Sequence, residues 1–222
     1  MAPRIAVLVF PGSNDDRDAT RALRLLGAEP VPVWHGQDEL PDVQAVVLPG
    51  GFSYGDYLRC GAIARFSPAM RAVARYAADG GLVLGICNGF QILAEAGLLP
   101  GVLRANASLE FVCADVPVIV ERCDLPFTTR SKPAQRLTLP IKCGEGAWYG
   151  EVPDEQVVLR YADGNPTGSV DRIAGVCNEA GNVMGLMPHP EHAFDPLLGS
   201  PDGALILGSL VDAARDRLSV FV

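Results

Sequence analysis

The sequence predicts an α/β protein with an open, mostly parallel, doubly wound sheet of the flavodoxin-like type and an antiparallel extension. Three observations indicate this class. Short apolar runs alternate with helical patterns in the first half. Several of those runs contain no polar residue, as is usual for strands buried on both faces. The second half changes to short β-rich runs. With 222 residues, the chain is expected to form one domain over residues 1–222.

The first half is expected to supply the parallel strands and the helices that cover them. In order, we predict a strand at 5–10, a helix at about 16–26, strands at 30–34 and 45–48, a helix at about 68–78, a strand at 82–86 and a helix at 90–96. Glycine directly follows the first and last of these helical patterns, at Gly27 and Gly97, and glycine is a common helix terminator.

The second half is expected to be antiparallel. Its β-rich runs lie at 116–120, 137–141, 157–161, 173–178 and 183–187. The sequence Glu-Ala-Gly-Asn at 179–182 suits a hairpin turn between the last two runs. An amphipathic helix at 202–218 should close the chain.

Composition narrows the classes of function. The chain carries 18 basic and 26 acidic residues, a formal net charge of −8, and no long cluster of lysine or arginine, so nucleic acid is not an expected partner. No apolar run approaches membrane-spanning length, and the chain opens directly into a strand, so no membrane partner is expected. Six cysteines without a C-x-x-C pair suit a reducing compartment. We therefore expect a cytoplasmic protein.

Cys87 is the leading candidate for a catalytic nucleophile. It lies between the apolar run at 82–86 and a helical pattern, and therefore on a tight strand-to-helix turn. Gly85 and Gly89 flank it at i−2 and i+2, where a nucleophile elbow requires small residues. The start of a helix also favours the thiolate over the thiol. The alternative is a buried cysteine that packs as a small hydrophobe, but the flanking glycines favour a functional role.

Three loops are expected to meet at one edge of the sheet, because ligands of open α/β sheets bind beyond the carboxyl ends of the strands. One is the loop at 49–55, with the sequence Pro-Gly-Gly-Phe-Ser-Tyr-Gly. The second is the turn at Cys87, and the third is Pro-His-Pro-Glu at 188–191. A site made from these loops would contain both a thiol and an imidazole.

His189 and Glu191 are the candidate base and the candidate residue that orients it, as cysteine catalysis requires. Residues i and i+2 of an extended segment project to the same side, so Glu191 could hold the imidazole. Of the other two histidines, His35 suits a surface or packing role, and His192 should point away from Glu191 in an extended run. An ordinary loop histidine is the alternative interpretation of His189.

The attack of a thiolate on an amide creates an oxyanion, which backbone N–H groups must stabilise. The Gly50-Gly51 pair allows close approach of the backbone, and the N–H of Asn88 follows the nucleophile, the usual position of a second donor. The alternative for Gly50-Gly51 is an ordinary turn after a strand.

Other sites have weaker support. No phosphate-binding G-x-x-x-x-G-K-[ST] motif occurs, so no nucleotide site is expected in this chain. Cys143 could join a histidine at a metal, but no ligand-spaced pair exists and no metal is expected. Asp15 and Asp16 suit capping and the first turn of the helix at 16–26.

The motif G-x-C-x-G-x-Q at 85–91 together with His-Pro-Glu at 189–191 resembles the class I (triad) glutamine amidotransferases. The longer stretches at 49–65 and 85–93, with 11–14, 173–176 and 187–191, are similar to glutaminase subunits of purine biosynthesis, and the likeness runs nearly end to end. The resemblance implies a single glutaminase domain.

The resemblance also implies a role for each candidate. Cys87 would be the nucleophile, His189 the base and Glu191 its orienter. Gly51 and Asn88 would form the oxyanion hole, and Gln91 would help to bind L-glutamine beside Gly50, Gly51 and Phe52. The substrate would be hydrolysed through a thioester. The resemblance implies no cofactor in this chain, since ATP and Mg²⁺ would belong to a separate synthetase subunit, joined by a small bridging subunit.

The chain departs from the usual pattern of the family at three positions. Cys143 stands where a histidine is usual, His192 where an arginine is usual, and Asp15 where a cysteine is usual. None of these departures removes a member of the triad, but the role of position 143 is left open.

Two other functions compete with this one. A stress-type cysteine hydrolase or deglycase of the same fold would pair the cysteine with an acidic residue on the first strand's loop, where this chain has Pro-Gly-Ser-Asn at 11–14. A regulatory subunit without turnover would not need an intact set of Cys87, His189 and Glu191.

Overall fold

The structure is a computed structural model that describes residues 1–219. The described residues form a nine-stranded sheet with the strand order β2-β1-β3-β4-β11-β10-β9-β6-β7. The strands of its parallel part are β1 (Arg4–Val9), β2 (Glu29–Trp34), β3 (Ala45–Leu48), β4 (Leu82–Ile86) and β11 (Val183–Leu186). Those of its antiparallel part are β10 (Ile173–Cys177), β9 (Val157–Tyr161), β6 (Val112–Val120) and β7 (Arg136–Cys143). The predicted fold class is confirmed.

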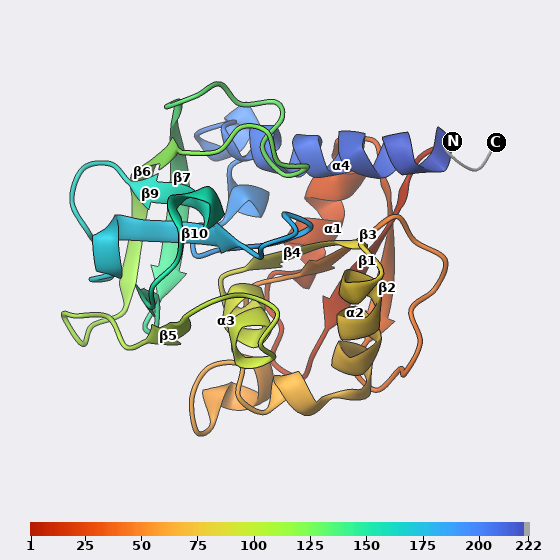
Figure 1. Ribbon diagram of the computed structural model, residues 1–222, viewed down its shortest axis with the longest axis horizontal. Helices are drawn as coiled ribbons and strands as arrows, with labels where there is room; N and C mark the ends of the chain where they lie inside the picture. The colour runs from red at the N-terminus through yellow and green to blue at the C-terminus, as the bar shows by residue number, and fades with distance from the viewer. Residues whose placement is uncertain (220–222) are drawn as a thin grey trace.

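Helices cover both faces of the parallel part. They are α1 (Asp16–Leu25), α2 (Pro68–Ala78), α3 (Asn88–Glu95) and α4 (Gly203–Ser219). In Figure 1, α1 and α4 lie above the strands β1, β3 and β4, and α2 and α3 lie below them. Every residue of β3 and β4 is buried, as their apolar sequences predict for strands covered on two sides.

The strand β11 joins the two parts of the sheet. It pairs in parallel with β4, with Leu186 opposite Ile86, and antiparallel with β10. The predicted hairpin turn between β10 and β11 is confirmed, because the N–H of Gly181 donates to the carbonyl of Asn178. The parallel pairing with β4 was not predicted, and it places the loop after β11 beside the loop after β4.

Most element boundaries agree with the predictions within two residues. The strand β6 is an exception, because it begins at Val112 rather than at residue 116. A small second sheet of β5 (Val102–Arg104) and β8 (Ala147–Tyr149) was also missed. Three-residue strands carry too little periodicity for sequence reasoning to detect.

Among residues 1–219, the loops contain six short 3₁₀ segments: η1 (Ser53–Asp56), η2 (Ala64–Phe66), η3 (Asp154–Gln156), η4 (Val170–Arg172), η5 (Pro190–His192) and η6 (Pro196–Leu198). Of these, η5 matters most for the candidate site, because it contains Glu191 and directly follows His189. It packs against α1, α4 and β7.

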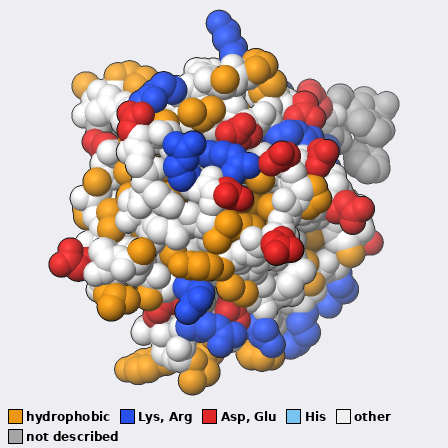
Figure 2. Space-filling model, turned by 60° about the vertical axis from the view of Figure 1, so that its left-hand side comes forward, with side chains coloured by type: hydrophobic (Ala, Val, Ile, Leu, Met, Phe, Trp, Pro, Cys, Tyr) orange, Lys and Arg blue, Asp and Glu red, His pale blue; other side chains and the backbone are white. Residues whose placement is uncertain are grey.

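The closing helix α4 buries one face against the rest of the molecule, through Ile206, Leu207, Leu210, Val211 and Ala214. This agrees with the amphipathic helix predicted at 202–218. In the described part of the chain, no helix is both long and apolar enough to cross a membrane. Figure 2 shows the face on the side of the antiparallel strands, where acidic and basic side chains are interspersed among apolar ones.

Candidate active site

Cys87 lies on a strained turn between β4 and α3. Its backbone has φ 49° and ψ −104°, a conformation that residues with a Cβ rarely adopt. The N–H of Cys87 donates to the carbonyl of Leu186 over 2.8 Å, which ties the turn to the end of β11. This is the geometry of a nucleophile elbow, and it agrees with the expected position of Cys87.

The two glycines around Cys87 allow the chain to pack closely. A Cβ at Gly89 would overlap the carbonyl oxygen of Leu48, at the end of β3. A Cβ at Gly85 would lie 2.7 Å from the carbonyl oxygen of Gly89. The elbow therefore requires small residues at both positions because α3 starts in contact with two strands.

His189 and Glu191 form a buried pair. His189 Nδ1 lies 2.6 Å from Glu191 Oε1, and the two side chains are at most 1% exposed. In the described part of the chain, Nε2 of His189 is buried and has no hydrogen-bond partner. The imidazole is thus held through one nitrogen, and the other remains available to accept a proton.

The strand β7 is a shared support for His189 and Cys87. The N–H of His189 donates to the carbonyl of Pro140 over 2.8 Å. The thiol of Cys87 contacts the carbonyl of Lys142, two residues further along the strand, over 3.9 Å. Segments about one hundred residues apart in sequence therefore meet on a single strand.

The prediction for His192 was wrong. Residues 190–192 form the 3₁₀ turn η5 instead of an extended run. The turn brings His192 Nε2 to 3.7 Å from Glu191 Oε1 and to 3.2 Å from Asp15 Oδ1. Glu191 still reaches His189, but through this turn and not through the extended geometry that was expected.

The environment of Cys87 favours the thiol. Burial raises the pKa of Cys87 well above its usual value, and nearby Cys143, Glu191 and Asp15 raise it further. A hydrogen bond from the backbone N–H of Asn88 acts in the opposite direction but does not offset them. The expectation that the helix start would favour a thiolate is therefore corrected, because burial outweighs it here.

A cavity of about 190 Å³ opens beside Cys87. Its lining includes Gly51, Phe52 and Gln91, three of the four predicted substrate-binding residues. The rest of the lining is Asp56, Cys60, Cys87, Phe111, Lys142, Cys143, Gly144 and Glu145. The fourth predicted residue, Gly50, instead lies against the base, since a Cβ there would be 2.6 Å from Cε1 of His189.

Gln91 is held by its neighbours on both ends of its side-chain amide. Its Nε2 donates to the carbonyl of Glu145 over 2.7 Å, and its Oε1 accepts from Asn88 Nδ2 over 2.9 Å. The side chain of Asn88 also accepts from the N–H of Ser53. Asn88 thus connects the elbow to the loop after β3, and Gln91 connects it to the loop after β7.

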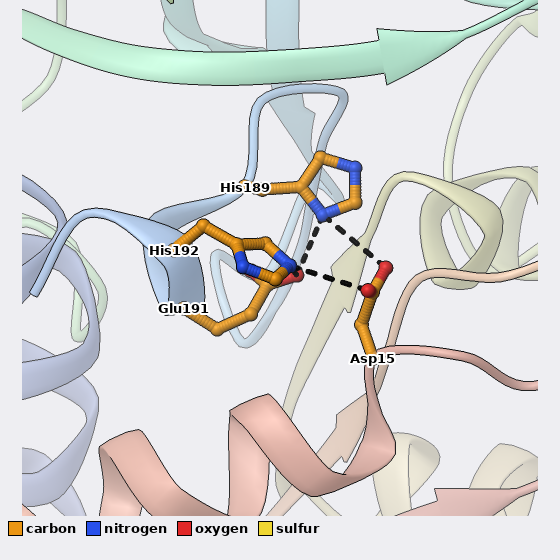
Figure 3. Close-up of side chains that lie close together, drawn as sticks. All are labelled: Asp15, His189, Glu191 and His192. Carbon is orange, nitrogen blue, oxygen red and sulfur yellow. Dashed lines mark hydrogen bonds and ion pairs between the residues drawn. The ribbon is translucent and has the colours of Figure 1, made fainter. Parts of the chain in front are cut away.

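Asp15 does not cap α1 as predicted. It stands at the N-cap position, but its side chain makes no capping hydrogen bond. It is only 4% exposed, and its carboxylate contacts His192 and His189 (Figure 3). It also contacts the ammonium of Lys142. Asp16, by contrast, lies in the first turn of α1 as expected.

Four side chains around the base are the strongest candidates for a metal site in the described residues. The ligand atoms of Asp15, His189, Glu191 and His192 lie within 4.8 Å of one another. However, Lys142 Nζ already lies 2.6 Å from Asp15 Oδ1 and 3.0 Å from His192 Nε2. The ammonium supplies the positive charge in this group, so we interpret it as a hydrogen-bonded ion network.

Sequence reasoning missed the contribution of the antiparallel part. Lys142 and Glu145 line the cavity from the end of β7 and the loop after it, and Asp56 lines it from η1. Burial raises the pKa of Asp56. Asp56 follows the glycine-rich loop, and Glu145 lies in a glycine-flanked sequence, so a signal existed for both. Lys142 lies inside a strand, and no sequence pattern distinguished it.

Comparison with known proteins identifies close relatives. The family model of the CobB/CobQ-like glutamine amidotransferase domain matches residues 2–201. The phosphoribosylformylglycinamidine synthase subunit PurQ of Gloeobacter violaceus is 54% identical, covering 95% of this chain and 98% of that protein. The same subunit of Rubrobacter xylanophilus is 53% identical, covering 96% of this chain and 99% of the relative.

Solved structures give the same result for the fold. The PurLQS structure from Thermotoga maritima contains a chain that is 47% identical, with a TM-score of 0.90, covering 98% of this chain and all of that one. A putative GMP synthase subunit of Thermoplasma acidophilum has a TM-score of 0.73 at 18% identity, and the match covers all of this chain and 98% of that one. The latter likeness concerns the fold alone.

Proposed function

This chain belongs to the CobB/CobQ-like glutamine amidotransferases and, within them, to the PurQ subunits of phosphoribosylformylglycinamidine synthase of purine biosynthesis, and we propose that Cys87, His189 and Glu191 carry its glutaminase reaction. The observation that supports this assignment most is the buried His189–Glu191 pair, in which Nε2 of His189 has no partner among the described residues. His189 follows β11, and the elbow of Cys87 follows the neighbouring strand β4. A base oriented through one nitrogen can take up a proton at the other.

In the proposed reaction, Sγ of Cys87 attacks the side-chain carbonyl carbon of L-glutamine while Nε2 of His189 takes the thiol proton. The N–H groups of Gly51 and Asn88 stabilise the oxyanion of the tetrahedral intermediate. His189 then returns the proton to the leaving nitrogen, so that ammonia departs and a thioester remains. Water, activated by the same imidazole, hydrolyses the thioester to glutamate and restores the thiol.

The raised pKa of Cys87 supports a reaction in which proton transfer accompanies attack, because little thiolate exists in the resting site. Because its ammonia would be used by a separate subunit, the free chain should also have low activity. We therefore expect the glutaminase rate to rise when the partners bind, and equal rates with and without them would count against this part of the proposal.

The partners are proposed from the relatives. The solved PurLQS structure holds the related chain in one assembly, so we propose that this chain works with a PurL-type synthetase and a small PurS-type bridging subunit. The synthetase would use ATP and Mg²⁺ to convert formylglycinamide ribonucleotide to formylglycinamidine ribonucleotide with the released ammonia. The chain itself would need no cofactor.

Exposed apolar side chains support a docking surface around the cavity. Phe52 and Phe111 line the cavity, and they are 45% and 54% exposed. Tyr57, Leu58 and Leu109 are more exposed still. Such residues are costly to leave in water and are common at interfaces.

We propose that the protein is located in the cytoplasm. Its six free cysteines are consistent with this reducing compartment.

One observation favours the deglycase alternative, and the comparisons with relatives count against it. Asp15 does bring an acidic side chain from the loop after β1 to the base, which the sequence argument had overlooked. Family membership nevertheless favours the glutaminase, because the match extends over nearly the whole chain.

The assignment of the nucleophile can be tested with the chloroketone analogue of glutamine. The reagent should label Cys87 by a factor of about 100 faster than the other cysteines, and peptide mass spectrometry would locate the adduct. Cys113 is an internal control, because it is exposed and would be labelled first by a reagent that follows accessibility alone. Labelling that follows exposure, or that persists unchanged in His189→Gln, would contradict the proposal.

A further inference from the structure

Asp15 is the N-cap residue of α1, but its side chain does not cap the helix. An aspartate there normally accepts hydrogen bonds from the first N–H groups of its helix, which stabilises the helix. The carboxylate of Asp15 makes no such bond and is 4% exposed. Burial of a charge is costly without partners, so its surroundings must supply the stabilisation.

Three side chains from two other elements surround the carboxylate. Lys142 Nζ, from β7, lies 2.6 Å from Oδ1, and His192 Nε2, from η5, lies 3.2 Å from the same oxygen. The other oxygen, Oδ2, lies 3.5 Å from His189 Nδ1. Figure 3 shows Asp15 and Glu191 on the same side of the His189 ring, away from Nε2.

Gly50 provides an independent sign that this contact is built into the fold. A Cβ at position 50 would overlap Asp15 Oδ2 and lie 2.6 Å from His189 Cε1. The carbonyl of Gly50 also accepts from the N–H groups of Asn14 and Asp15, each over 3.2 Å. The loop after β3 therefore holds Asp15 by its backbone and leaves room for its side chain beside His189.

The surroundings of Asp15 and His192 favour the charged form of both groups. Burial alone would raise the pKa of Asp15, but the hydrogen bond with His192, the charge of His189 and the contacts with Lys142 lower it well below its usual value. The pKa of His192 is raised, chiefly by its hydrogen bond with Asp15. Asp15 therefore stays ionised beside the base.

We propose that Asp15, held by Lys142 and His192, is a second carboxylate for His189, a positioning residue that holds the ring and places negative charge behind Nδ1. Glu191 is the nearer acceptor, and Asp15 adds an electrostatic contribution at 3.5 Å. The inference rests on the proposed role of His189 as base. It assigns a function to Asp15 and His192, which are far apart in sequence and meet in space.

The expected effect has a definite sign. The charged groups that face His189 and Asp15 are Glu191 and His192 from η5 and Lys142 from β7, with the thiol of Cys87 from the elbow nearby. Removal of the Asp15 charge makes each proton of the Cys87–His189 pair easier to lose. The pH profile should then move to lower pH, whereas removal of the Lys142 charge should move it to higher pH.

The experiment measures the rate at which the chloroketone analogue of glutamine labels Cys87 as a function of pH, together with kcat and KM for glutamine in the assembled enzyme. In Asp15→Asn, the midpoint of the pH profile of Cys87 labelling should fall by about one pH unit, as expected for the loss of one close charge. Below the wild-type midpoint, the labelling rate should therefore rise by up to ten-fold, since one pH unit of proton affinity is a factor of ten. On the plateau, kcat should fall by at most ten-fold with KM little changed, because a less basic imidazole takes up the thiol proton less readily. In Lys142→Met the midpoint should rise.

The variants separate this role from a structural one. The side chain of Asp15 makes no capping bond to lose, and Asn has nearly the same shape, so Asp15→Asn should keep α1 intact. Asp18→Asn removes a charge from the same helix and should leave the midpoint unchanged. Two results would overturn the inference. One is a loss of stability in Asp15→Asn without a shift in the midpoint of its labelling profile. The other is a shift of the same sign in Asp15→Asn and Lys142→Met. If wild-type Cys87 is not labelled at all, the proposed function fails instead.

Discussion

The two sides of the His189 ring differ in charge, in hydrogen bonding and in origin. Around Nδ1 lie two carboxylates, a second imidazole and an ammonium, contributed by the start of α1, by β7 and by η5. Around Nε2 no partner exists among the described residues, and the lining of the cavity nearby includes the buried thiols of Cys87 and Cys143. The comparison teaches that one side fixes the base electrostatically, while the other is kept free of competing hydrogen bonds.

The difference also appears in titration. On the charged side, ionised forms are favoured, because partners stabilise Asp15 and His192 in their charged states. On the cavity side, neutral forms are favoured, because burial raises the pKa of Cys87 and raises that of Cys143 to about 12. A proton transferred from the thiol to the imidazole would therefore move toward the side that accommodates charge.

The largest effect should come from the cavity side. Cys87→Ala removes the proposed nucleophile, and glutamine-dependent turnover should fall by about 10⁴-fold or more. The assembled enzyme should still use free ammonia, because the synthetase step does not need this thiol. Turnover with glutamine and with ammonium chloride measures both. Retained glutamine turnover would show that another group attacks the amide.

The next largest effect should come from the nearer carboxylate on the charged side. Glu191→Gln keeps the shape but removes the charge 2.6 Å from His189 Nδ1, and kcat should fall by about 10²- to 10³-fold. This loss should exceed that of Asp15→Asn, because Asp15 is farther from the ring. Steady-state kinetics of the two single variants and the double variant would establish the order, and the reverse order would mean that Asp15 is the principal partner.

A smaller effect should follow from crowding the charged side. In Gly50→Ala the new methyl group must displace the Asp15 carboxylate or the His189 ring. We expect kcat to fall about ten-fold and the free energy of unfolding to fall by about 1–3 kcal/mol, the usual cost of overpacking. Gly36→Ala is the matched control, because a Cβ there meets only ordinary contacts. Equal behaviour of the two variants in denaturant unfolding and in kinetics would contradict the close packing at position 50.

The smallest effect concerns stability at high pH, and it tests whether the thiol of Cys143 is buried away from water. The pKa of Cys143 is raised by burial from 9.0 to about 12, so the unfolded chain loses this proton first as pH rises. The folded state then binds more protons, and stability falls with pH between those two values by about 1.4 kcal/mol per pH unit for this thiol. In Cys143→Ala, the free energy of unfolding should fall less steeply with pH, by the slope that corresponds to one proton. Chemical denaturation at pH 9, 10 and 11 would measure the difference, and parallel curves would indicate a hydrated thiol.

The sequence alone determined the fold class, most element boundaries and the elbow. These features depend on local chemistry: apolar runs such as residues 45–48 must be buried, and glycines at 85 and 89 permit the turn at Cys87. The pairing of His189 with Glu191 was also predicted, although it is made through the 3₁₀ turn η5 and not through the extended segment that the prediction assumed. Local spacing carries this kind of information well.

The tertiary structure alone decided the surroundings of the base. Asp15, Lys142 and His192 lie up to 177 residues apart in sequence, and they meet because β11 pairs with β4 and because η5 packs against α1 and β7. Local rules predicted a capping role for Asp15 and an outward direction for His192, and both failed. A buried charge is stabilised by whatever partners surround it in space, and the spacing of residues along the chain does not record those partners.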